Sequence, residues 1–227
     1  MKNLDLTIAI PAYNEEDNIE KAVLLAVKVA DKLKISYEIL VVDDGSRDNT
    51  PLLLTKLGKK YPQIRIITHP VNLGIEPSLK DLYKNALGKT TFFNGADNEI
   101  RMTILPGMIR KLKQGNDIVV AQRISKEYNL FRHTMSWGFN LLIKLFFGFD
   151  PYDAGCAKLF KTSIYKKIQI KSTSVFGEAE RLIKASRYGY KISSVKVTHY
   201  PNQKPSSVKL WTPVLAFRDF VWLLIRN

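Results

Sequence analysis

Short polar segments follow four apolar runs of the chain, at points where buried strands would end. These segments are residues 11–16, 43–46, 94–99 and 122–123, and the first three carry carboxylates. Carboxylates can hold a ribose hydroxyl, the edge of a base or a hard divalent cation, which takes oxygen ligands. Such a cation would in turn neutralise a diphosphate. The pattern therefore indicates a binding site built from several loops.

The residues alone also allow other interpretations of single motifs. The segment Asp43-Asp44-Gly45-Ser46 is also typical of a turn with helix-capping groups. His69, His133 and His199 lack the spacing of zinc ligands, so we expect them to be structural. Cys156 is expected to be a small buried side chain.

The elements that position the polar segments alternate between strands and helices. Strands are predicted at 7–10, 38–42, 64–68, 91–94 and 117–121, and helices at 15–34, 51–60, 77–87 and 104–114. Asn14 is expected to cap the first helix. This alternation predicts an α/β fold with a mostly parallel sheet and helices on both faces. Ligands of such sheets bind beyond the carboxyl ends of the strands, which is where the polar segments lie.

The second half of the chain contains two unusually apolar helices. The pattern predicts helices at 132–147 and 176–188, a strand at 191–199, and a last helix that starts at Thr212. Apolar residues surround most of the last helix, and a helix of that kind is buried or meets lipid. We expect it to lie at a membrane interface, with packing on the sheet or on a partner subunit as the alternative.

Charge and composition limit the classes of function. The chain has 227 residues, a length suited to one domain, and a formal net charge of +14. The excess implies an anionic partner, but the basic residues are scattered, which argues against nucleic acid. The single cysteine excludes an internal disulfide framework and fits a reducing compartment. No signal-peptide pattern and no apolar stretch of ~20 residues is present, so we expect a soluble or peripheral protein.

Two motifs resemble family-2 glycosyltransferases. They are the segment TIAIPAYNEE at residues 7–16 and the segment LVVDDGSRDNT at residues 40–50. The most similar subgroup is the dolichyl- or polyprenyl-phosphate sugar synthases, and the likeness continues to about residue 190. It implies a GT-A (nucleotide-diphospho-sugar transferase) fold of one domain. Residues 1–125 would bind the nucleotide sugar, and residues 126–227 would bind the acceptor.

The resemblance assigns the donor pocket by position. Pro11, Tyr13 and Glu15 would line the base pocket, and Asp43 would contact the base or ribose, with Asp44 beside it.

The resemblance also assigns residues to the metal and the phosphates. Asp97 matches the last aspartate of the family's Asp-x-Asp motif and would ligate Mg²⁺ or Mn²⁺, with Glu99 as a further oxygen ligand. Arg123 and Arg132 would face the phosphates of donor or acceptor. Glu180 fits the helix glutamate near the acceptor.

Three positions depart from the family's pattern. Gly95 stands where the first aspartate of the metal motif is expected, and the segment 202–205 lacks the usual arginine and glycine. The pair Glu76-Pro77 replaces the small residues of many relatives. We expect Glu99 to compensate for Gly95, and a catalytically impaired nucleotide-sugar-binding relative is the alternative.

The expected reaction is sugar transfer to a polyprenyl-phosphate type lipid, with inversion, by a peripheral protein at the cytoplasmic membrane face. A phosphate acceptor is already anionic, so it needs positioning and stabilisation of the leaving group more than a base. Transfer to a saccharide hydroxyl is the alternative and would need a carboxylate base. Asp97 and Glu180 are the candidates for that base.

Overall fold

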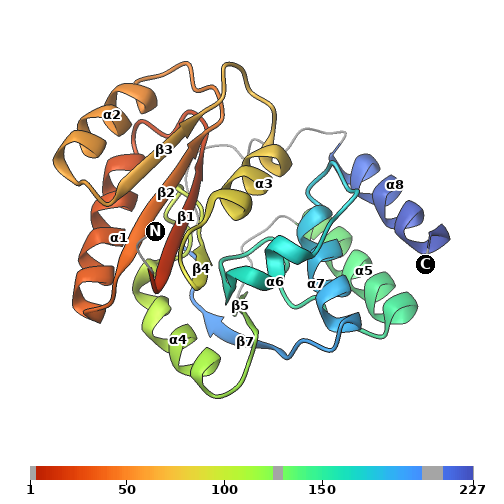
Figure 1. Cartoon of the computed structure of the whole chain (residues 1–227). Coiled ribbons are helices and arrows are strands. Elements are labelled where there is room, and N and C mark those ends of the chain that lie inside the picture. Colours follow the sequence, from red (N-terminus) through yellow and green to blue (C-terminus); the bar gives the residue numbers. More distant parts are fainter. Residues whose placement is uncertain (1–3, 125–129, 201–211, 227) are drawn as a thin grey trace.

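A computed structural model describes residues 4–124, 130–200 and 212–226, with the side chains of 130–137 and 212 left undescribed. Within these ranges the strands form one seven-stranded sheet in the order β3-β2-β1-β4-β6-β5-β7 (Figure 1). The strands are β1 (Leu6–Ala12), β2 (Tyr37–Asp43), β3 (Ile64–Thr68), β4 (Thr90–Phe93), β5 (Ile118–Arg123), β6 (Lys158–Lys161) and β7 (Ile192–Val197).

All neighbouring strands run parallel except at β6, which is antiparallel to both β4 and β5. The carboxyl ends of the other strands therefore share one edge of the sheet with the amino end of β6. The predicted mostly parallel sheet is confirmed. β6 itself was not expected, because a four-residue segment such as KLFK, with a lysine at each end, carries little strand signal.

Helices cover both faces of the sheet, as predicted. One core cluster joins the sheet to α1 (Ile19–Leu33), α2 (Thr50–Lys60) and α4 (Leu105–Lys113). On the other face a second cluster joins it to α3 (Ile75–Asn85), α6 (Thr162–Lys167) and α7 (Gly177–Arg187). A short 3-10 helix, η1 (Met102–Ile104), precedes α4. The strands of the middle of the sheet are buried on both sides, which explains their nearly continuous apolar runs.

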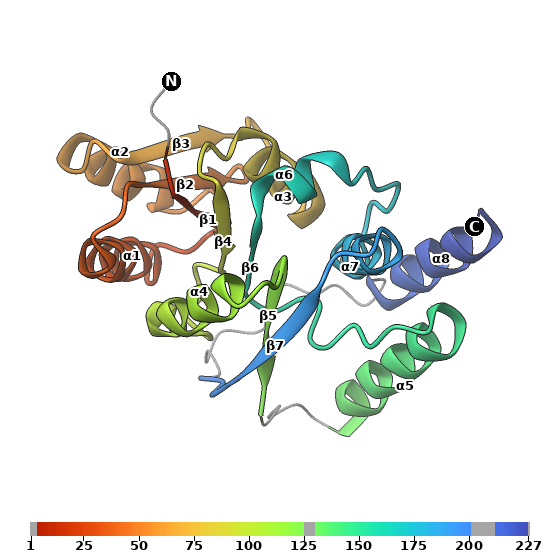
Figure 2. The ribbon, with the colours of Figure 1, turned by 60° about the horizontal axis from the view of Figure 1, so that its bottom comes forward.

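The two apolar helices α5 (Leu130–Phe147) and α8 (Thr212–Ile225) lie beside α7, away from α1 and α2 (Figure 2). A third cluster holds them together through Ile143 of α5, Ile183 of α7 and Phe220 of α8. Phe217 and Trp222 of α8 remain about half exposed, which shows that the cluster covers only one side of this helix. No helix among the described residues has the length and apolar content required to cross a bilayer.

The first helix starts later than its sequence suggests. α1 begins at Ile19 with Asn18 in the capping position, not at Glu15 after Asn14. Asn14 instead adopts a left-handed backbone with φ 54°. The expectation was wrong because side chains of the segment after β2 satisfy the backbone N–H groups of residues 14–16, which leaves those residues free to form a loop.

Candidate functional site

The segments after β1 and β2 are joined by side-chain hydrogen bonds at the carboxyl edge of the sheet. The N–H of Asn14 donates to Ser46 Oγ over 2.9 Å, and the N–H of Arg47 donates to Asn14 Oδ1 over 2.9 Å. The N–H of Glu15 donates to Thr50 Oγ1 over 2.9 Å. These reciprocal contacts fix the loop that carries the predicted base-pocket residues. Tyr13 lies in that loop with more than a third of its surface exposed.

Asp43 ends β2 as a fully buried carboxylate. Its Oδ1 accepts a hydrogen bond from the N–H of Ser46 over 3.1 Å. Its Oδ2 is buried and has no hydrogen-bond partner among the described residues. A buried polar atom without a partner is costly, so this oxygen is suited to receive a donor group from a ligand.

Asp44, in contrast, is fully engaged by the protein. Its Oδ1 contacts His69 Nδ1 at 2.7 Å and accepts from the N–H of Leu73 at 2.9 Å, while its Oδ2 accepts from the N–H of Gly74 at 2.8 Å. His69 Nε2 lies 3.0 Å from Asp81 Oδ2 of α3. Asp44 therefore holds the segment that leads into α3. Its predicted contact with a nucleotide remains a prediction.

The charge on His69 is stabilised by its two neighbours. Burial alone would lower the pKa of this imidazole, but hydrogen bonds and charge from Asp44 and Asp81 outweigh burial and raise the pKa above its ordinary value. His69 therefore links two carboxylates from different elements, and their charges favour its protonated form. Gly45 allows the segment after β2 to approach the backbone of Asn72 closely. Its φ is +68°, and an added Cβ would lie 2.7 Å from Asn72 N.

Asp97 and Glu99 lie together in the segment after β4. The N–H of Glu99 donates to Asp97 Oδ1 over 3.1 Å. Burial raises the pKa of the Asp97 carboxyl and outweighs the hydrogen bond from the Glu99 N–H, which lowers it; the charge of Glu99 adds to the rise, and the charges of Arg123 and His199 oppose it. An anionic Asp97 is thus disfavoured in the protein alone, and a bound cation would favour it. Gly95 lies against the same carboxylate, since an added Cβ would be 3.0 Å from Asp97 Oδ1.

Residues from the two halves of the chain meet Glu99. His199 Nε2, just after β7, lies 3.1 Å from Glu99 Oε2. Arg123 NH1, at the end of β5, lies 3.9 Å from the same oxygen. Arg123 also forms a two-point ion pair with Asp153, through Nε at 2.7 Å and NH2 at 2.9 Å. Asp153 precedes β6, whose amino end lies at this edge because β6 is antiparallel.

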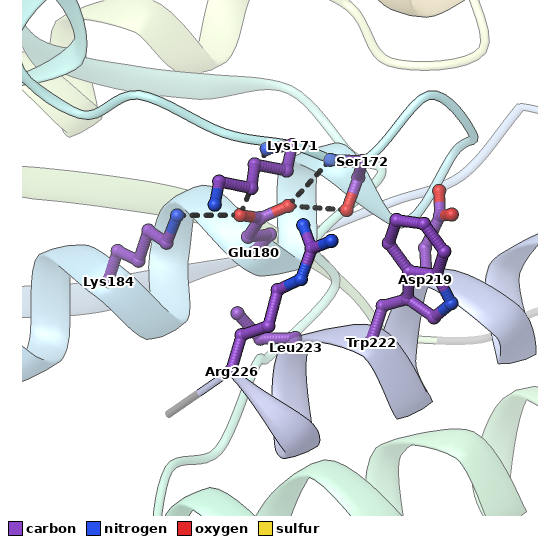
Figure 3. A pocket seen from close by; sticks show the side chains of 8 residues that line it. All are labelled: Lys171, Ser172, Glu180, Lys184, Asp219, Trp222, Leu223 and Arg226. Carbon is purple, nitrogen blue, oxygen red and sulfur yellow. Dashed lines mark hydrogen bonds and ion pairs between the residues drawn. The ribbon is translucent and has the colours of Figure 1, made fainter.

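Glu180 lies apart from these contacts, on the side of α7 that faces α8 (Figure 3). Its carboxylate accepts from the N–H and Oγ of Ser172 and pairs with Lys184 Nζ at 2.7 Å. Burial would raise the pKa of Glu180, but hydrogen bonds from Lys184 and Ser172 outweigh it and hold the pKa below its usual range. A small cavity of about 90 Å³ adjoins it, lined also by Trp222 and Arg226.

The structure thus brings Asp97, Glu99 and Arg123 together and places Asp43 at the same edge of the sheet. Pro11 lies within β1, and Arg132 lies on α5 with a side chain outside the described residues. The segment 202–205, which differs from the family's pattern, also lies outside the described residues. Among the described residues, Glu180 contacts Lys171, Ser172 and Lys184 rather than another predicted site residue, and its role near an acceptor remains a prediction.

Two residues at this edge had no assigned role from the sequence. Asp153 carries no motif of its own, and only its place before the family-like segment 158–160 could have drawn attention to it. His199 was expected to be structural because it lacks metal-ligand spacing. Its contact with Glu99 depends on the pairing of β5 with β7, which spacing along the chain does not reveal.

No cluster of three or more His, Cys, Asp or Glu side chains in the described part of the chain is arranged to hold a metal ion by itself. Asp97 and Glu99 nevertheless offer two carboxylates in one segment. Divalent cations bound with phosphates commonly use one or two carboxylates and complete their shell with phosphate oxygens and water. The donor set therefore fits a cation that arrives with a diphosphate.

The family model described as "Glycosyl transferase family 2" matches residues 7–169. An uncharacterized glycosyltransferase of Synechocystis is 36% identical over 124 residues, which cover 55% of this chain and 39% of that protein. The dodecaprenyl-phosphate galacturonate synthase of Rhizobium johnstonii is 26% identical over 211 residues, covering 89% of this chain and 61% of that protein. The chain thus spans about two fifths to three fifths of the length of these relatives.

Solved structures share the fold. Glucosyl-3-phosphoglycerate synthase from Mycobacterium tuberculosis, in a complex with Mn²⁺, UDP and glucosyl-3-phosphoglycerate, matches with a TM-score of 0.77 at 15% identity. The match covers 97% of this chain and 80% of that protein. The crystal structure of the same enzyme in a complex with Mg²⁺ and UDP gives the same TM-score. The predicted GT-A fold is therefore confirmed.

We predict that His69→Gln removes a pH-dependent part of the stability. Because the folded-state pKa of His69 is raised, its contribution is complete below the ordinary value of about 6.5 and is lost as pH rises through the folded-state pKa. At pH 6 the variant should be less stable by about 1.5–3 kcal/mol, the range for hydrogen bonds to charged groups. The difference should shrink at pH 9. Urea unfolding at both pH values measures it, and a larger difference at pH 9 would contradict the role of protonated His69.

Proposed function

Because the chain belongs to glycosyl transferase family 2, we propose that it transfers a sugar, with inversion, from a nucleotide-diphosphate donor to a polyprenyl-phosphate type lipid. The observation that carries the proposal is the gathering of Asp43, Asp97 and Glu99 at the carboxyl edge of the sheet. This edge is where open α/β sheets bind their ligands. Residues 1–125 would form the donor half and residues 126–227 the acceptor half of one domain.

The donor would bind across the ends of β1, β2 and β4. The unpartnered Oδ2 of Asp43 would accept a hydrogen bond from the base or ribose, which removes the cost of leaving it unsatisfied. Pro11, Tyr13 and Glu15 would line the base pocket from the neighbouring loop. Solved structures of the same fold contain UDP, which is compatible with a nucleotide at this edge.

Asp97 and Glu99 would hold Mg²⁺ or Mn²⁺ together with the diphosphate. When bound, the cation would stabilise the charge on the departing nucleoside diphosphate. Burial disfavours a free negative charge on Asp97, so the site suits a positive partner. His199 would keep Glu99 in place through the contact at 3.1 Å.

The acceptor phosphate is ionised at neutral pH and can attack without a base. One of its oxygens would form the bond to the anomeric carbon while the bond from that carbon to the donor diphosphate breaks. The electron pair of the broken bond leaves with the nucleoside diphosphate, and attack from the opposite side inverts the carbon. Arg123 and Arg132 would orient phosphate groups, and Asp153 would keep Arg123 extended by its two-point contact.

A lipid acceptor is supported by the names of two relatives and by the apolar helices. One relative is named a dodecaprenyl-phosphate galacturonate synthase and another an undecaprenyl-phosphate 4-deoxy-4-formamido-L-arabinose transferase. Exposed apolar side chains gather on α5 and α8, and we call them the apolar face: Leu141, Leu145, Phe146, Val214, Leu215, Phe217, Trp222 and Ile225. Lys144 of α5, Arg218 of α8 and Arg226, which directly follows α8, suit anionic lipid. The apolar face would lie on the cytoplasmic membrane surface.

One observation favours a second candidate, a nucleotide-sugar-binding relative with impaired catalysis. Gly95 supplies no carboxylate, and an added Cβ there would lie 3.0 Å from Asp97 Oδ1, so the Asp97 side chain would have to shift slightly. In this alternative the edge of the sheet binds nucleotide weakly and turnover is slow. Transfer to a saccharide hydroxyl is a further alternative, for which the raised pKa of Asp97 would suit a general base.

We predict that Asp97→Ala weakens Mn²⁺-dependent binding of nucleoside diphosphate at least about tenfold, or about 1.4 kcal/mol. Calorimetry with UDP and GDP, with and without Mn²⁺, measures the affinity. Glu99→Ala should have a comparable effect because it would remove a ligand of the same cation. Asp5→Ala is the matched control, since Asp5 lies at the opposite edge of the sheet. Equal affinities for Asp97→Ala and Asp5→Ala in Mn²⁺ would refute the donor site, and an unchanged Glu99→Ala would exclude Glu99 as the compensating ligand.

We also predict that the full chain sediments with anionic liposomes. Replacing Phe217, Trp222 and Ile225 by Ser should reduce the bound fraction, because these side chains are exposed and their loss spares the packed side of α8. Leu52→Ser/Leu87→Ser, which removes two exposed apolar residues elsewhere, is the control. A wild-type chain that stays in the supernatant at low salt would overturn the membrane proposal and favour a partner subunit on the apolar face.

A further inference from the structure

Four charged side chains form a buried cluster between the start of α3 and the other half of the sheet. The cluster consists of Glu76, Lys158, Glu178 and Arg181, which are at most 4% exposed. Two are acidic and two are basic, so their formal charges cancel. None of them belongs to the donor, metal or phosphate assignments above.

Arg181 is the centre of the cluster. Its NH2 lies 2.5 Å from Glu76 Oε1, and its NH1 lies 2.6 Å from Glu178 Oε1. Glu178 also pairs with Lys158 of β6. The backbone of α7 lies directly on the Glu76 carboxylate, because an added Cβ at Gly177 would overlap it. A charged contact of this kind accepts few alternative geometries.

The cluster continues into the segment that borders the donor site. Two residues before Glu76, the N–H of Gly74 donates to Asp44 Oδ2, and the N–H of Leu73 donates to Asp44 Oδ1. The segment 71–76 is thus held at residues 73 and 74 by Asp44, which is next to Asp43, and at its last residue by Arg181 of α7. Lys158 lies at the same edge of the sheet, where it pairs in register with Phe93 of β4.

Buried ion pairs are a weak source of stability, because apolar residues of similar size are often as stabilising. What the pair of Glu76 and Arg181 supplies is a directional contact between two segments. We propose that Glu76 and Arg181 are positioning residues that fix the segment 71–76 against α7, and thereby fix the donor pocket relative to the acceptor half. The inference deepens the proposed function and rests on it.

The test removes the pair without leaving an unpaired charge. Glu76→Leu/Arg181→Met deletes one acid and one base and leaves Glu178 with Lys158. Glu38→Gln/Arg65→Met is the matched control, since this ion pair of 2.6 Å lies near the amino ends of β2 and β3, away from the site. Arg181→Lys and Glu76→Gln are milder variants that keep a charge or an acceptor in place. Melting temperature, amide hydrogen exchange of residues 71–76 and affinity for UDP or GDP with Mn²⁺ are measured for each.

We expect the double variant to fold, to exchange the amides of Leu73 and Gly74 at least about tenfold faster, and to bind the nucleotide about five- to tenfold more weakly. For Arg181→Lys, the exchange rates and the nucleotide affinity should lie between those of the double variant and those of wild type. Glu76→Gln should be close to wild type in both properties, and the control pair should change neither. Unchanged exchange and affinity in the folded double variant would overturn the positioning role. If the double variant does not fold, wild-type exchange and affinity in Arg181→Lys would overturn it equally.

The two hypotheses fail in different ways. A wild-type chain that binds neither UDP nor GDP with Mn²⁺ would contradict the proposed function, whatever the exchange data show. A wild-type chain that binds one of them, with equal affinity in the double variant, would contradict only the positioning role of Glu76 and Arg181.

Discussion

Asp44 follows β2 with a buried carboxylate that needs hydrogen-bond donors, because burial removes its contact with water. It finds them in His69 after β3 and in two N–H groups of the segment that leads into α3. The ends of β2 and β3 and the start of α3 are therefore fixed relative to one another. Asp43, the preceding residue, keeps one buried oxygen that has no hydrogen-bond partner in the described part of the chain.

The direction of β6 determines which other polar groups lie at this edge of the sheet. Because β6 runs against its neighbours, the residues before it meet the residues after β4 and β5. Asp153 can then engage Arg123, and Arg123 can approach Glu99. The ionic cluster around Arg181 lies deeper, between this region and α3. Charged residues thus connect the two halves of one sheet where apolar packing alone would leave more freedom.

The repeating apolar runs were sufficient to predict the parallel part of the sheet and the edge at which polar residues gather. They could not predict β6 or α6, which are short and carry charged residues, nor the late start of α1 after a left-handed Asn14. Asp43, Asp97 and Glu99 lie where predicted strands end, and the expectation that ligands bind at strand ends singled them out. His199, Asp153 and the pair of Glu76 and Arg181 were given no role, because their contacts join positions 30 to 105 residues apart or depend on strand pairing.

The central claim is that the acceptor is a lipid phosphate, positioned by arginines at the edge that holds the donor. The most direct measurement follows radiolabelled sugar from a nucleotide-sugar donor into a polyprenyl phosphate and into the matching polyprenol, with Mn²⁺ present. The account predicts organic-extractable product with the phosphate and none with the alcohol, because the phosphate is already ionised and needs only orientation, whereas a hydroxyl would need a general base. Equal labelling of the alcohol, or transfer only to a saccharide, would contradict it.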